Sequence, residues 1–106
     1  MPKFLVEAKY TAEGAQGLLK SSATERRKAI EKLITSLGGK LETFYFTFGS
    51  DDAVIIIDLP STEAGLSVAF AVRASGMVQS TTTRLITVEE ADRAIDLHVK
   101  YVPPGG

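Results

Sequence analysis

The chain has 106 residues, of which 44% are hydrophobic and 24% charged, and its net charge is -1. A domain of this length can bury one core without disulfides. The charge balance lacks the basic surplus typical of phosphate-binding surfaces, so we expect no nucleic-acid partner. The absence of Cys excludes disulfides, thiolate metal sites and cysteine nucleophiles.

No targeting or membrane segment is evident in the sequence. Lys3, Glu7 and Lys9 interrupt the N-terminal apolar residues, so we expect no signal-peptide core there. No apolar run approaches the roughly 20 residues of a membrane helix. We therefore expect a cytoplasmic protein without a membrane partner.

The first predicted element is a strand over residues 4–10, where apolar and polar side chains alternate. Residues 11–21 contain two glycines, and we predict a loop there. A phosphate-binding loop would need Gly directly before Lys20, where Leu19 stands, so the segment is not interpreted as one.

A helix is predicted to begin after Ser22, because Ser22 and Glu25 have the spacing of a capping box. The basic run at residues 26–28 is predicted to lie on its solvated outer face, and Gly38-Gly39 is predicted to end it. Its apolar stripe consists of Ile30, Leu33, Ile34 and Leu37.

Residues 43–59 predict a β-hairpin around a Gly-Ser-Asp-Asp turn. The first strand places three phenylalanines on one face, and Tyr45 and Thr47 on the other. The second strand has an unbroken apolar run through Ile57, which suits a central strand covered on both faces. The phenylalanines are Phe44, Phe46 and Phe48.

Two helices and a strand follow the hairpin. A nearly chargeless helix is predicted over residues 62–75, with Phe70 packed on the sheet. A Thr-rich strand is predicted over residues 78–86. Thr87 and Glu90 then predict a third helix, which should place His98 on an apolar stripe with its ring at least half covered.

The element order β-α-β-β-α-β predicts an α+β protein with a ferredoxin-like antiparallel sheet, helices on one face and an additional C-terminal helix. We expect one domain over residues 1–102 and a tail over residues 103–106. The second sheet face should combine apolar and charged side chains, which favours pairing of two such faces in a homodimer. Its expected members are Leu5, Glu7, Lys9, Tyr45, Thr47, Val54, Ile56 and Asp58.

The segments Phe4–Thr11, Glu13–Lys20 and Leu37–Glu42, together with Ala74-Ser75-Gly76, resemble the GYD-domain family. Phe44-Tyr45-Phe46, leading to Gly49 and Asp52, and the Thr-rich strand also fit, so the resemblance covers nearly the whole chain. It implies a dimeric α+β barrel and no established activity. Related branches of that superfamily include cofactor-free monooxygenases, isomerases, haem enzymes and small-molecule sensor domains. Asp51 stands where the family has its name-giving Tyr, so no role of that phenol is carried over.

Two hypotheses of function follow. In the first, the protein is a homodimer, or a higher oligomer, that binds a small organic molecule in the barrel cavity through Tyr10, Tyr45, Thr83 and Arg84. In the second, it is a cofactor-independent enzyme, monooxygenase- or isomerase-like, in which His98 transfers protons together with Tyr10 or Asp52. Convergence of His98 with one of these partners would separate the two. We expect no metal and no cofactor in either case.

Overall fold

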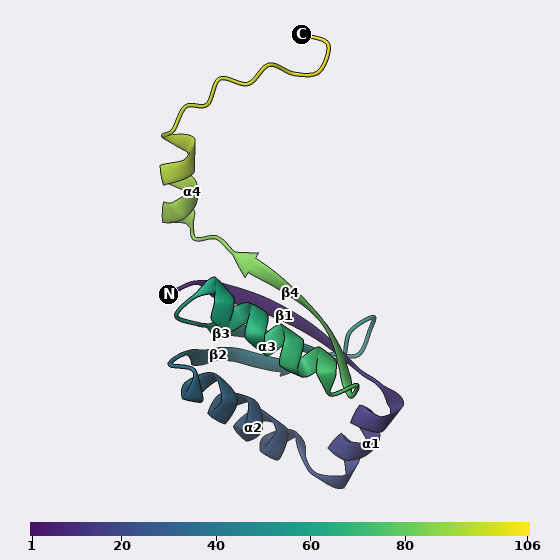
Figure 1. The fold of residues 1–106 in the computed structure, drawn as a ribbon. Helices are drawn as coiled ribbons and strands as arrows, with labels where there is room; N and C mark the ends of the chain where they lie inside the picture. Colours follow the sequence, from purple (N-terminus) through teal and green to yellow (C-terminus); the bar gives the residue numbers. More distant parts are fainter.

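The computed structural model describes all residues, 1–106, and its centre is a four-stranded antiparallel sheet (Figure 1). The strands lie in the order β2-β3-β1-β4. β1 (Lys3–Tyr10) and β3 (Ala53–Asp58) are therefore central, and β2 (Lys40–Phe46) and β4 (Val78–Leu85) form the edges. This is the ferredoxin-like arrangement that the sequence predicts.

Four helices accompany the sheet, each begun by a hydroxyl side chain that accepts from a backbone N–H of the first turn. They are α1 (Ala12–Lys20), α2 (Ala23–Ser36), α3 (Thr62–Ala74) and α4 (Val88–Ile95). α2 packs beside β2 and α3 beside β4. None of the four combines the length and the apolar character needed to cross a membrane.

The loop predicted over residues 11–21 is wrong, because most of this segment forms the helix α1. Thr11 begins this helix by accepting from the Gly14 N–H at 3.2 Å. Gly14 is buried, and a Cβ placed on it would collide with the carbonyl oxygen of Met77. This glycine therefore allows a close approach to the start of β4, which sequence alone does not distinguish from loop flexibility.

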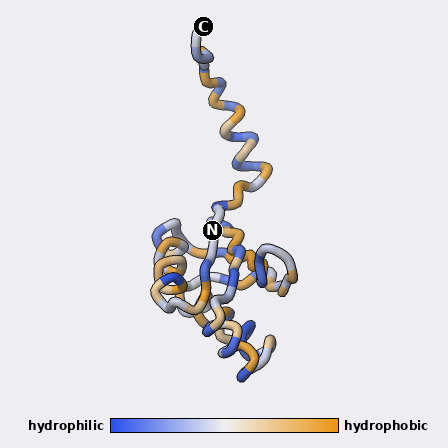
Figure 2. The backbone as a smooth tube through the Cα atoms, turned by 90° about the vertical axis from the view of Figure 1, so that its right-hand side faces the viewer, coloured by the Kyte–Doolittle hydropathy of each residue, from blue (hydrophilic) through white to orange (hydrophobic).

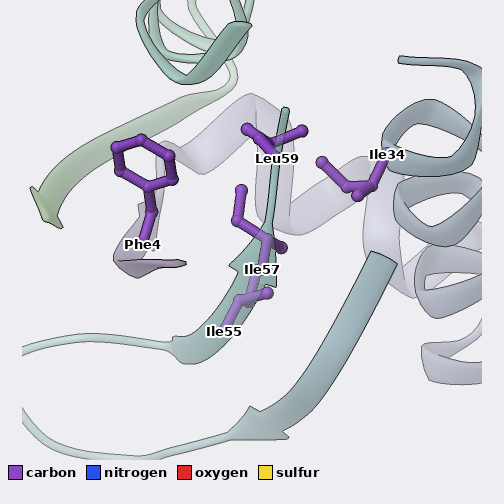
Figure 3. Packing of buried hydrophobic residues seen from close by; sticks show 5 residues of the cluster. All are labelled: Phe4, Ile34, Ile55, Ile57 and Leu59. Atoms are coloured by element: carbon purple, nitrogen blue, oxygen red, sulfur yellow. The ribbon is translucent and has the colours of Figure 1, made fainter. Parts of the chain in front are cut away.

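The core lies between the sheet and the helices α2 and α3 (Figure 3). The larger cluster of buried hydrophobic side chains contains Phe4, Ile34, Ile55, Ile57 and Leu59. α3 approaches closely at Gly65, where a Cβ would lie 2.7 Å from the Phe4 ring. A second cluster of Ala8, Ala53 and Val78 continues the core along the sheet.

The packing of α3 differs from the prediction. Phe70 is 63% exposed, so the expected burial of its ring on the sheet is wrong. α3 has two apolar stripes, and the one with smaller side chains faces the core through Gly65, Val68 and Val72. In the hairpin, β2 ends at Phe46, and Phe48 is fully exposed in the following loop rather than on the strand.

The last segment extends away from the rest of the chain (Figures 1 and 2). We call residues 86–106 the C-terminal arm and residues 1–85 the body. The radius of gyration is 17.1 Å, whereas a compact domain of this length has about 13 Å. No residue of α4 is buried. The helix ends at Ile95, and His98 is exposed with φ of 48°, so its predicted place on a covered helical stripe is wrong in the single chain.

Candidate functional site

The sheet face without helices, which we call the open face, is assembled by cross-strand register. Leu5 on β1 lies opposite Ile56 on β3 and Thr83 on β4. In the next row, Glu7 lies opposite Val54 and Thr81. Because successive side chains of a strand alternate between faces, these residues point away from the core members Phe4, Ile55 and Ile57. The open face comprises Lys3, Leu5, Glu7, Lys9, Lys40, Thr43, Tyr45, Val54, Ile56, Asp58, Gln79, Thr81, Thr83 and Leu85.

The centre of the open face is apolar although no helix covers it. Leu5, Val54 and Ile56 are only half-buried, and the half-buried Glu7 interrupts them. Tyr45 is 67% exposed at the β2 edge, and Thr83 is exposed at the β4 edge. An apolar strip is therefore bordered by hydroxyl groups and contains one carboxylate.

An ion-pair cluster lies at one end of the open face. Lys3 Nζ donates to Glu42 Oε1 at 2.7 Å and to Asp58 Oδ1 at 2.9 Å. Hydrogen bonds to Glu42 and then to Asp58 raise the pKa of Lys3 above its ordinary value. A register shift between Leu41 and Thr43 leaves Glu42 unpaired in the ladder and within reach of this cluster. Lys3 thus gives Asp58, which is only 9% exposed, a cationic partner.

The proposed proton-transfer residues do not converge in the single chain. Tyr10 and Asp52 are neighbours, but the contact is a hydrogen bond of 2.8 Å from the Tyr10 backbone N–H to Asp52 Oδ2. The Asp52 backbone N–H in turn donates to the Ala8 carbonyl at 2.8 Å, so Asp52 fixes the end of β1. His98 belongs to the C-terminal arm, which extends away from the body that contains Tyr10 and Asp52 (Figure 1).

The four predicted ligand-binding residues occupy both faces of the sheet. Tyr45 and Thr83 are on the open face, at opposite edges. Tyr10 and Arg84 are on the helix side, at opposite ends of the β1–β4 ladder, because they pair with Val78 and Phe4. Arg84 Nη2 also binds Glu90 Oε2 at 3.3 Å. Only Tyr45 and Thr83 could therefore contact a ligand on the open face of one chain.

A groove of about 460 Å³ on the helix side was not predicted. It lies between α1, α2 and α3, and its lining includes Leu18, Ile30 and Val72. The Arg26 guanidinium lies 5.8 Å from the centre of the Tyr10 ring, and Arg26 Nε is buried without a hydrogen-bond partner. Arg26 was predicted to be a solvated residue. Arg26 lies four residues before Ile30, so it shares the apolar stripe of α2. That spacing could have predicted from the sequence that Arg26 faces the groove.

No cluster of three or more His, Cys, Asp or Glu side chains that could hold a metal ion is assembled. The groove and the open face are thus the two surfaces that could accept a small molecule. They lie on opposite sides of the sheet. A ligand in one cannot contact the other.

Comparisons with known proteins support the fold. The family model of the GYD domain matches residues 4–95. Three chains of solved structures match, including the crystal structure of MtbAldR, with a TM-score of 0.59 and 21% sequence identity. That match covers 81% of this chain and 52% of the MtbAldR chain, so this chain corresponds to about half of that protein. No curated protein sequence matches at a significant level.

Proposed function

The chain belongs to the GYD-domain family, and on that premise we propose that it is a homodimer that binds a small organic molecule between the open faces of its two subunits. The proposal has two parts. The first is pairing of the open faces, and the second is a ligand in the space between them. Each part has its own test.

The observation that carries the proposal is the composition of the open face. Leu5, Val54 and Ile56 form an apolar strip across two central strands, interrupted by Glu7. Apolar patches rimmed by polar residues often mark interaction sites. A two-fold axis would place the strip against its own copy, because the same patch serves both subunits of an isologous dimer.

The polar groups on the same face favour a cavity between the paired subunits that holds water or a ligand, and they disfavour a dry interface. Glu7 lies within the strip, and the hydroxyls of Tyr45, Thr81 and Thr83 border it. A buried carboxylate or hydroxyl without a partner is costly, so water or a ligand has to satisfy these groups. This chemistry suits a small apolar or aromatic molecule that carries a hydrogen-bonding group.

The enzyme hypothesis has less support. General acid–base catalysis needs the reacting groups within hydrogen-bond reach. His98 is on the C-terminal arm, and the Asp52 carboxylate accepts from a backbone N–H. The groups named by the enzyme hypothesis, His98 with Tyr10 or Asp52, are not brought together beside either candidate surface, and binding is therefore the function we propose.

The dimer is tested by light scattering of the wild type and of Ile56→Lys. We expect the wild type to have twice the chain mass of 11.4 kDa and the variant to be monomeric, because the new charge would be buried without a partner. Leu19→Lys is the matched control, since Leu19 is 85% exposed on α1. A wild type that is monomeric at micromolar concentration would contradict the dimer.

The ligand is tested by native mass spectrometry with a panel of small aromatic and apolar compounds. Binding should be lost in Tyr45→Ala and retained in Arg26→Gln, because only Tyr45 is on the open face. The reverse pattern would place the ligand in the helix-side groove. That result would contradict the proposed location.

A further inference from the structure

We infer that the C-terminal arm is an exchange element that packs on the body of a second copy of this chain. The inference rests on the proposed homodimer and deepens it, because it adds a second contact to the pairing of the open faces. It concerns residues 86–102, which the first part of the proposal does not use.

The arm exposes apolar side chains along its whole length. Seven large ones, from Ile86 to Val102, are between 59% and 79% exposed. Figure 2 shows hydrophobic positions recurring along this extended segment. The seven are Ile86, Val88, Ile95, Leu97, Val99, Tyr101 and Val102.

Two periodicities in succession show that the arm suits a partly buried surface. Within α4, Val88, Ala91 and Ile95 recur at helical spacing on one stripe. After α4, Leu97, Val99 and Tyr101 alternate with polar residues, as in a half-buried strand. A solvated tail would need neither pattern.

The start of the arm is ordered by a helix cap and by one ion pair to the body. Thr87 and Glu90 form a reciprocal capping box, with both hydrogen bonds at 3.1 Å. The Arg84–Glu90 ion pair joins this cap to β4. The resulting helix leads away from the body (Figure 1). An isolated helix of eight residues is marginal in water, so α4 needs a surface to pack on.

Two observations favour a second copy as that surface. The arm leaves from β4, an edge strand of the open face, so it is continuous with the proposed dimer contact. The arm carries four acidic and two basic residues, whereas the body carries ten basic and nine acidic ones. The basic excess includes Arg26, Arg27, Lys28 and Lys32 of α2 against Glu25 and Glu31. The net charge of the arm is therefore opposite in sign to that of the body, which favours contact between an arm and a body.

Exchange of this kind is reciprocal. In a two-fold dimer each copy would give one arm and receive one, which leaves no arm unsatisfied.

Because the chain has no Cys, one introduced cysteine can carry a spin label at a single known position. Copies of Asp96→Cys with a nitroxide label are mixed with ¹⁵N-labelled wild-type copies. We expect paramagnetic broadening of body amides in the ¹⁵N-labelled copies. Broadening seen only when label and ¹⁵N are in one chain means that the arm folds back on its own body, and no broadening means that it has no docking site. Either result overturns the inference.

Substitutions separate this inference from the proposed function. Leu97→Ser with Val99→Ser should raise the dissociation constant of the dimer at least tenfold, whereas Lys100→Ser, in the same segment, should leave it unchanged. If Ile56→Lys dissociates the dimer and the double variant does not, the open-face pairing holds and the exchange is wrong. If only the double variant dissociates it, the open-face pairing is wrong and the exchange holds.

Discussion

The body and the C-terminal arm have equally clear helix-start signals, yet they differ completely in burial. Ser61 begins α3 as Thr87 begins α4, each by accepting from a backbone N–H three residues later. α3 then packs on the sheet through Gly65 and the residues near it, whereas α4 has no buried residue. Local signals therefore set where a helix begins, whereas burial depends on a surface elsewhere in the molecule.

The largest loss of stability is expected from a substitution in the core of the body. Phe4 is 4% exposed and contacts α3 at Gly65, so Phe4→Ala should lower the free energy of unfolding by about 3–5 kcal/mol. Phe70→Ala is the matched control. Because Phe70 is exposed, its loss should change the free energy by less than about 1 kcal/mol in urea titrations at low protein concentration. Equal losses would show that α3 docks through its other stripe.

An intermediate effect is expected at α1. Gly14→Ala places a Cβ against the Met77 carbonyl, and such overpacking costs about 1–3 kcal/mol. Gly17→Ala, in the same helix, meets nothing within 4 Å and should stabilise the protein by about 0.5–1 kcal/mol, because Ala is the better helix former. Thermal unfolding of both variants measures the contrast. A stabilising Gly14→Ala would contradict the close approach of α1 to β4.

The smallest effect concerns the cap of the arm. The hydrogen bond from the Thr87 backbone N–H lowers the pKa of Glu90 below its ordinary value of 4.5. Since the folded-state pKa is the lower one, the capping box stabilises α4 above pH 4.5, and this contribution is lost as the pH falls through the folded-state pKa. An NMR titration of the Glu90 carboxyl should show the lowered pKa.

The same NMR titration of Glu90 is repeated in the variant Thr87→Ala. It removes the side-chain half of the box and frays the first turn, so the pKa of Glu90 should return toward its ordinary value. An unchanged pKa in the variant would mean that the cap does not order the arm.

The sequence predicted the parts of this fold that depend on local pattern. The alternation along β1 and β3, the caps at Ser22 and Thr87, and the other predicted members of the open face all follow from spacing. These features are confirmed because strand and cap geometry involve neighbours in the chain. Thr47 was also expected on the open face, but it lies beyond the end of β2 at Phe46.

The predictions that failed depended on distant contacts. α1 was missed because the reason for Gly14 is the carbonyl of Met77, 63 positions later in the numbering. Phe70 was assigned to the core because periodicity cannot say which of two apolar stripes of α3 faces the sheet. His98 was placed on a covered helix, but α4 ends at Ile95 and has no part of its own body beneath it. The helix-side groove likewise requires three helices to be in place before it exists.

We propose that a second copy covers the apolar surfaces that the body and the arm leave exposed. Amide hydrogen exchange over a series of protein concentrations tests it most directly. We predict that the amides of α4 are protected at high concentration and lose this protection on dilution, while those of β1 stay protected until the body itself unfolds. Amides of α4 that exchange at the unprotected rate at every concentration would contradict the claim.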